Sequence, residues 1–373
     1  MTDAQLAEAK RYGRQQLICA LVDRAIDLAY LAVMALALAR PLDAWLGHWP
    51  LVARYASLRL LGLLWIVAGL HAVLSFPLSY YSGHVLEHRY GLSTQTLLAW
   101  LWRWVKRLAL GLALGSILVP GLFWVIWLTG PYWWLVGTAA FLLVSVVLGQ
   151  LVPVLILPLF YRIERLDNPE LAGRIARLTE GTGLSIEGVY RMGLSEETVK
   201  ANAMLAGLGR TRRVLLGDTL LANFTPEEIE VIFAHEVGHH VFRHIRKMIL
   251  ASIASSALGF WICDRLLVAW VGSGPHGFDY AQTPVYALPF LLLVLAIFGL
   301  LLEPLQNYIS RRYERQSDRY ALQRTGQKAA YQSAFRKLAQ LNKDDPSPPR
   351  LEVLLFHSHP PIAERLAAAE GRD

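Results

Sequence analysis

The sequence has few charged residues and almost no cysteine. Only 17% of its 373 residues are charged and 54% are hydrophobic, whereas soluble domains average about 25% charged residues. Its two cysteines, Cys19 and Cys263, both lie in apolar stretches, so no disulfide framework or cysteine-based metal site can be built from them. Residues 1–16 are polar and lack the apolar run and cleavage site of a signal peptide. These absences argue against a small disulfide-stabilised protein and against an average soluble enzyme.

Long apolar stretches account for much of the chain. A helix that crosses a bilayer needs about 20 mostly apolar residues. Six stretches meet this length: Leu17–Ala39, Leu60–Tyr81, Leu108–Thr129, Trp133–Leu159, Met248–Val271 and Val285–Leu305. The first contains Asp23, Arg24 and Asp27, which we expect to face a bundle interior or a hydrated cavity. The sequence therefore predicts a mainly α-helical, polytopic membrane protein with about six transmembrane helices; buried helices of a large soluble core are the weaker alternative.

The net charge of +7 reflects a distribution of Lys and Arg that predicts the orientation of the chain in the membrane. Lys and Arg are concentrated near the N-terminus, between the second and third stretches, after the fourth stretch and near the C-terminus, while the loops at 130–132 and 272–284 contain none. The positive-inside rule therefore predicts a multi-pass protein of a bacterial inner membrane or an ER-type membrane, with both termini and the large polar segment in the cytoplasm. No nucleic-acid motif is present, and we expect no nucleic-acid partner.

The polar segment after the fourth stretch predicts a small α+β unit. Residues 168–182 have helical spacing of their apolar side chains. The segments 188–192, 202–207 and 214–216 favour strands. At Thr225, an N-cap residue precedes a proline and two glutamates, which is typical of a helix start.

These patterns divide the chain into four parts. We predict an N-terminal transmembrane region at 1–165 with four spans, a cytoplasmic catalytic domain at 166–247, a transmembrane hairpin at 248–309, and a C-terminal part of the catalytic domain at 310–373.

The helix that begins near Thr225 carries the sequence His235-Glu236-Val237-Gly238-His239. Residues at i and i+4 project from one helix face, so His235 and His239 can direct imidazole nitrogens to one metal ion. Glu236 lies beside the first ligand, where it can act as general base toward a water molecule on a metal. An exposed helix with two surface histidines is the alternative. His240 and His244 have other helical phases, and we interpret them as lesser candidates that face the membrane boundary.

A third ligand is expected outside this helix. Phe242 and Ile245 stand where the metzincin pattern has its glycine and third histidine, so that class is excluded. Glu314 and Asp318 share a helix face after the sixth stretch, so one can ligate while the other supports the site. The predicted hairpin of the fifth and sixth stretches would bring this helix beside the histidines. A solvated ion-pair network is the alternative for these carboxylates.

At this point the sequence resembles the CAAX prenyl protease type of membrane zinc metallopeptidase. The resemblance covers nearly the whole chain. It rests on Phe76-Pro77, Glu87 with Tyr90–Thr96, Pro158–Phe160, Asn202-Ala203, Arg213–Leu216 with Asp218–Leu221, the His235–His239 motif, the run from Ser310 to Asp318, and His359–Arg365.

The resemblance implies a site as well as a fold. One zinc ion per chain would be held by His235, His239 and Glu314, with Glu236 as the catalytic base and Asp318 behind the ligands. His359 would stabilise the transition state. The substrate would add as a strand along Asn202, Ala203, Met204, Leu205, Ala206 and Gly207. The fold would be a membrane chamber with a small zincin-like α+β catalytic domain.

The implied function is an endopeptidase, acting as a monomer in the lipid bilayer, that cleaves peptide or protein substrates of membrane-associated or prenylated type near their C-terminus. The sequence departs from the eukaryotic members in having six predicted spans instead of seven, with Ser317 and Ala201 in place of the usual Ala and Ser. Two alternatives remain: an HtpX-like quality-control protease, and a six-span transporter or metal-handling protein. The absence of a repeat between the two halves argues against transport.

Overall fold

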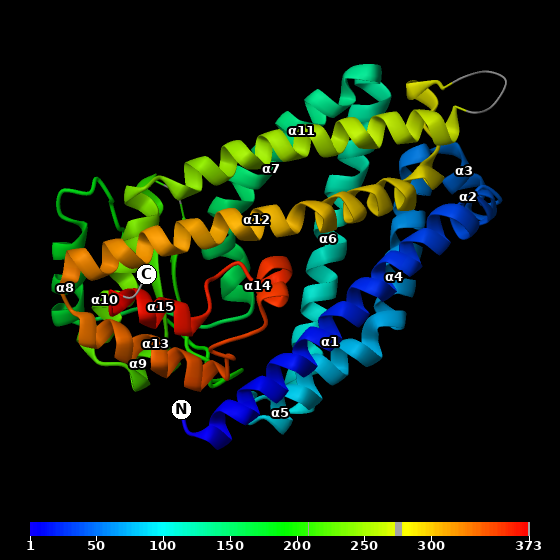
Figure 1. Cartoon of the computed structure of the whole chain (residues 1–373). Coiled ribbons are helices and arrows are strands. Elements are labelled where there is room, and N and C mark those ends of the chain that lie inside the picture. Colours follow the sequence, from blue (N-terminus) through cyan, green and yellow to red (C-terminus); the bar gives the residue numbers. More distant parts are fainter. Residues whose placement is uncertain (208, 273–277, 372–373) are drawn as a thin grey trace.

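The computed structural model describes residues 1–207, 209–272 and 278–371 (Figure 1). Residues 273–277, within the loop 272–284 that lacks Lys and Arg, lie outside this part, as do 372 and 373 at the end of the predicted C-terminal region. The helices of the N-terminal half are α1 (Asp3–Val33), α2 (Ala39–Leu46), α3 (Pro50–Arg54), α4 (Ala56–Tyr80), α5 (Glu87–Arg89), α6 (Leu97–Thr129) and α7 (Trp133–Leu151). The later helices are α8 (Pro169–Thr179), α9 (Asp218–Asn223), α10 (Pro226–Val241), α11 (His244–Val271), α12 (Leu288–Thr325), α13 (Lys328–Asn342), α14 (Arg350–Phe356) and α15 (Ile362–Ala369).

All six predicted spans are helical. Among the described residues, four helical stretches are long and apolar enough to cross a membrane: Ala56–Arg89, Leu97–Leu159, His244–Val271 and Val285–Thr325. The second of these holds two predicted spans, because the chain turns at Gly130 and α6 packs against α7. The predicted span 17–39 lies in α1, its π-helical continuation and the start of α2, and is not among these four.

Two of the three charged residues in the first predicted span contact other helices, and the third, Asp23, lines a cavity. Arg24 lies 2.8 Å from Glu303 of α12, and Asp27 lies 2.7 Å from His71 of α4. Asp264 of α11 is fully buried and accepts a hydrogen bond of 2.8 Å from the indole of Trp133. Pairing of this kind lowers the cost of ionisable groups inside an apolar bundle.

A four-stranded sheet forms the frame of the predicted catalytic domain. Its strands are β1 (Ile163–Arg165), β2 (Gly188–Met192), β3 (Ala203–Ala206) and β4 (Arg213–Gly217), in the order β1-β2-β4-β3. Strand β4 pairs in parallel with β2 and antiparallel with β3, which leaves β3 at an edge. The three predicted strands are confirmed. The sequence did not predict β1, which has three residues and therefore no readable periodicity.

Helices α8 and α10 cover this sheet with apolar side chains. Leu171, Ile175 and Leu178 of α8 are buried in one cluster with Val214 of β4 and Phe233 of α10. The start of α10 matches the prediction, since Thr225 and the residue three positions later form a reciprocal capping box.

The two helices α11 and α12 run side by side from the apolar helices to the predicted catalytic domain (Figure 1). Helix α12 packs against α10, which confirms that the two motif helices are neighbours, as predicted. The N-terminal part of α1 also reaches the predicted catalytic domain, where Glu8 lies 2.7 Å from Lys343 and Lys200 lies 2.9 Å from Glu87. Both ends of the described chain therefore lie near the predicted catalytic domain (Figure 1).

Candidate metal centre

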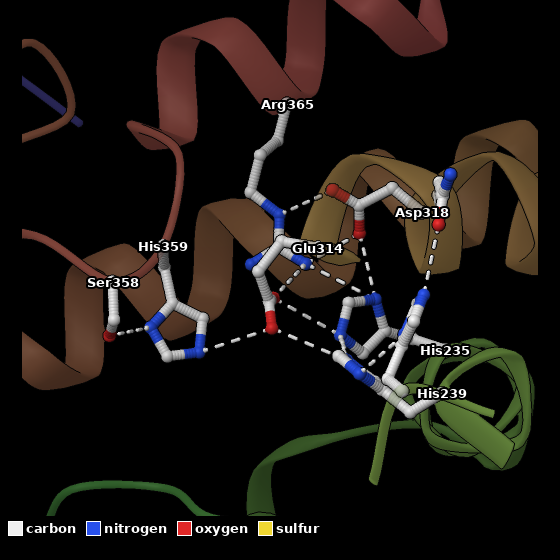
Figure 2. Close-up of polar contacts among 9 residues, drawn as sticks. His235, His239, Glu314, Asp318, Ser358, His359 and Arg365 are labelled. Atoms are coloured by element: carbon white, nitrogen blue, oxygen red, sulfur yellow. Dashed lines mark hydrogen bonds and ion pairs between the residues drawn. The ribbon is translucent and has the colours of Figure 1, made fainter. Parts of the chain in front are cut away.

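Three side chains from two helices converge at the contact between α10 and α12 (Figure 2). His235 and His239 of α10 direct their Nε2 atoms toward each other at 3.2 Å. The carboxylate of Glu314 on α12 lies 3.3 Å from both of these nitrogens, with Oε2 facing His235 and Oε1 facing His239. Among the described residues, these three are the group whose ligand atoms are placed to hold a metal ion.

The spacing of these atoms fits a tetrahedral metal ion. Zinc bonds of about 2.0–2.1 Å to nitrogen and oxygen give ligand atoms separated by about 3.3 Å around a tetrahedron. The three observed separations are 3.2, 3.3 and 3.3 Å. Oε2 of Glu314 is buried and has no hydrogen-bond partner among the described residues, so its lone pairs are available to a cation.

The charge of the centre also favours a cation. Burial lowers the pKa of His235, but its hydrogen bond to Asp318 and the nearby carboxylate of Glu314 outweigh burial and raise that pKa to about 9. The two carboxylates therefore favour positive charge at this position. A divalent cation in the same place would satisfy the same lone pairs.

Asp318 fixes the tautomer of His235. Nδ1 of His235 donates a hydrogen bond of 2.9 Å to Oδ1 of Asp318, which leaves the lone pair on Nε2 directed at the centre. Asp318 in turn accepts hydrogen bonds from Arg365 of α15, at 2.9 Å from Nε and 2.5 Å from Nη2 (Figure 2). Arg365 is buried over the ring of Phe335. The sequence singled out Asp318 but assigned no role to Arg365, although its motif contains it.

A second chain of contacts supports His239, and it corrects the interpretation of His244. His244 is buried rather than at the membrane boundary, with its Nδ1 atom 3.1 Å from Nδ1 of His239 and its Nε2 atom 2.9 Å from Oε1 of Gln316. The Gln316 oxygen can only accept, so His244 donates from Nε2 and accepts from His239 at Nδ1. His239 therefore keeps the lone pair on Nε2 free for the centre. Tyr313 stacks on the ring of His244 at 4.2 Å.

The sequence placed His244 at the membrane boundary by assuming one continuous helix through residue 244. That prediction is wrong because α10 does not continue that far. Helix α10 ends at Val241, and Arg243 adopts a left-handed conformation with φ 56° before α11 begins. The new helix turns His244 back toward His239. His240, in contrast, lies 2.9 Å from Arg212, and it remains outside the group of ligands.

A cavity of ≈ 670 Å³ opens onto two of the three converging side chains, His235 and Glu314. Glu236, His359, Asn202 and Ala203 line it together with His235 and Glu314. Nε2 of His359 lies 3.6 Å from Oε1 of Glu314 (Figure 2). The other predicted substrate residues follow along the edge strand: Met204, Leu205 and Ala206 within β3, and Gly207 directly after it with φ 90°. All residues that the sequence selected for the site are thus close to the cavity or on the strand beside it.

Comparison with known proteins agrees with this geometry. A family model described as the N-terminal part of CAAX prenyl proteases, with five membrane helices, matches residues 1–162, and a model of peptidase family M48 matches residues 165–373. The chain belongs to peptidase family M48. It is therefore a membrane metalloendopeptidase, and the transport alternative is set aside.

Individual relatives of the M48 chain lie in bacteria and eukaryotes. An uncharacterized metalloprotease of Bacillus subtilis, YhfN, is 26% identical over 375 residues, which cover 100% of this chain and 87% of that protein. CAAX prenyl protease 1 of Saccharomyces cerevisiae is 31% identical over 333 residues, which cover 84% of this chain and 72% of that protein.

The fold has a counterpart in a solved structure. The crystal structure of Ste24p from S. mikatae matches with a TM-score of 0.86 and 24% identity, over 99% of this chain and 89% of that chain. The predicted fold class, a helical membrane protein with a small α+β catalytic domain, is confirmed.

Proposed function

We propose that this M48 peptidase is a zinc endopeptidase that cleaves membrane-associated peptides near their C-terminus. The observation that carries the proposal is the tetrahedral spacing of His235, His239 and Glu314 at one cavity. Two histidines and a carboxylate form a common ligand set of catalytic zinc, with one position left open. Zinc, when bound, would polarise a peptide carbonyl and lower the pKa of a coordinated water to near 7.

In this mechanism Glu236 is the general base. It follows His235 on the same helix turn and lines the cavity, so its carboxylate can take a proton from the attacking water. It then donates this proton to the nitrogen of the leaving amine, which returns the carboxylate to its starting state. His359 lines the same cavity and would donate a hydrogen bond to the carbonyl oxygen as negative charge develops there.

The substrate would bind along the outer edge of β3. This strand pairs with β4 on one side, and its other edge carries backbone groups that can pair with an extended peptide. Asn202 directly precedes β3 and Ala203 is its first residue, and both line the cavity. A second cavity of ≈ 900 Å³ shares Asn202 with the first and extends to Asp23 of α1, so the adjoining space can receive the part of the substrate beyond the scissile bond.

The mechanism is tested by metal analysis and peptide hydrolysis of Glu236→Gln. We expect about one zinc per chain in both wild type and variant, with hydrolysis lowered by about 10²–10⁴-fold. Glu196→Gln is the matched control, because Glu196 is exposed and far along the chain from the motif. Normal hydrolysis in Glu236→Gln would refute the role of the base. Glu314→Ala tests the ligand set in the same assay, and unchanged zinc content there would refute it.

The substrate class is tested with a short peptide in farnesylated and unmodified forms. Relatives carry the name CAAX prenyl protease, and on that basis we propose a lipidated substrate for this chain. A higher kcat/KM for the farnesylated peptide supports the proposal. Equal rates for both peptides would reject the lipid preference and leave the protease mechanism intact, with quality control as the function to test next.

A further inference from the structure

The short helix α14 is attached to α12 by side chains that contact its last carbonyl groups. Nη1 of Arg311 donates hydrogen bonds to the carbonyl oxygens of Val353 and His357, at 2.7 and 2.5 Å. The side-chain amide of Asn307 donates to the carbonyl oxygen of Leu355 at 2.8 Å. The last carbonyls of a helix have no partner within it, so these two buried α12 residues complete the C-terminal end of α14.

The segment held in this way leads directly to His359. The side chain of His359 is 64% exposed, and its polar neighbours are Ser358, at 3.0 Å from Nδ1, and Glu314, at 3.6 Å from Nε2. Neither contact packs the imidazole on several sides. The position of the ring therefore depends on the backbone that carries it.

The same face of α12 also carries the metal centre. Asn307, Arg311, Glu314 and Asp318 follow one another at intervals of four, three and four residues, and all are buried. The first two hold α14, the third is a candidate ligand, and the fourth binds Arg365 of α15. The segment 357–361 is thus attached to α12 before and after His359, while Pro360 and Pro361 restrict its backbone.

We propose that Arg311 is a positioning residue that holds His359 at the distance from Glu314 that the reaction requires. This inference rests on the proposed role of His359 in catalysis. Arg311 binds the carbonyl of His357, two residues before His359, and lies one helical turn from Glu314 on α12. It therefore links the backbone before His359 to the helix that carries Glu314.

The first test compares Arg311→Met with Arg311→Lys and with Arg312→Met. Arg312 is exposed on the next position of the same helix, which makes it a matched control. We expect Arg311→Met to lower kcat by about 10–100-fold, as a misplacement of about 1 Å can, with KM and zinc content close to wild type. Lysine can donate to one carbonyl and should recover part of kcat. Wild-type kcat in Arg311→Met would overturn the proposal.

A double variant separates positioning from general stability. If Arg311 acts through His359, Arg311→Met in a His359→Ala background should leave kcat at the value of His359→Ala alone. Independent effects that multiply would overturn the proposal, and so would a His359→Ala variant with wild-type kcat. Failure of the wider zinc mechanism is recognised separately, by normal hydrolysis in Glu236→Gln.

A spectroscopic measurement on the metal-free protein gives a readout that does not depend on activity. A nitroxide attached at Leu351→Cys reports on α14, since Leu351 is 67% exposed and the native cysteines are buried. Its mobility should rise in Arg311→Met and stay unchanged in Arg312→Met. An unchanged spectrum in Arg311→Met would overturn the proposal. If Arg311→Met does not fold, Asn307→Leu removes a single bond to α14 and is measured in the same way.

Discussion

Gly238 of α10 lies directly against Ser317 of α12, at the level of the candidate metal centre. A Cβ atom at residue 238 would lie 3.0 Å from the Cα atom of Ser317 and 3.2 Å from its Cβ atom. This close approach brings Glu314 within 3.3 Å of both histidines. The glycine in the motif is therefore required by the packing of two helices, and not by the conformation of its own backbone.

Gly238→Ala should separate α10 from α12 and weaken metal binding. Overpacking of this kind costs about 1–3 kcal/mol, which exceeds the gain of up to about 1 kcal/mol from alanine in a helix. We expect a lower unfolding temperature and a lower zinc content after dialysis. The control is Gly173→Ala in α8, where the nearest atom to the new Cβ would lie 3.7 Å away. Zinc retention equal to that of Gly173→Ala would contradict the packing argument.

Asp318→Asn should affect both metal affinity and stability, for different reasons. His235 loses the anionic partner of its Nδ1–H group, which we expect to weaken zinc binding by about 10–100-fold. Arg365 is left as a buried charge without its carboxylate, which costs about 3–5 kcal/mol of unfolding free energy. In the double variant Asp318→Asn/Arg365→Met, stability should return while zinc affinity stays low. Recovery of zinc affinity in the double variant would show that Asp318 acts through stability alone.

His244→Phe tests the support of the second histidine. Phenylalanine can keep the stack on Tyr313, but it removes the acceptor for the Nδ1–H group of His239. We expect the zinc dissociation constant to rise by about 10–100-fold, measured by competition with a chelator. His240→Phe is the matched control and should bind zinc like wild type, because His240 contacts Arg212 and not the centre. Equal zinc affinity in the two variants would remove His244 from the site.

Cysteine labelling tests the predicted orientation in the membrane. We expect a cysteine at Gln282, between α11 and α12, to react with an impermeant maleimide from the side opposite the catalytic domain. A cysteine at Ala329, exposed on α13, should react only from the cytoplasmic side. Cys19 and Cys263 are buried and should contribute little background. Labelling of both positions from one side would refute the topology that the Lys and Arg distribution predicts.

Much of the fold could be predicted from the sequence because local residue patterns specify it. The apolar stretches predicted the membrane helices by length alone, and β2 agrees with its predicted range because its residues sit between clear turn signals. The start of α10 followed from Thr225 and Pro226. The three-residue strand β1 was missed, since it forms only by pairing with β2.

For the site, too, the local sequence determined one part of the arrangement and the tertiary structure determined the rest. The sequence alone determined that His235 and His239 share a face, since four residues along a helix return a side chain to the same side. Without the family resemblance, it left open which carboxylate of α12 faces them. Tertiary structure decided this, because the contact of Gly238 with Ser317 sets the position of α12 along α10 and turns Glu314, not Asp318, into the centre. It also decided the place of His244, because a left-handed residue at Arg243 ends the helix on which the sequence argument relied.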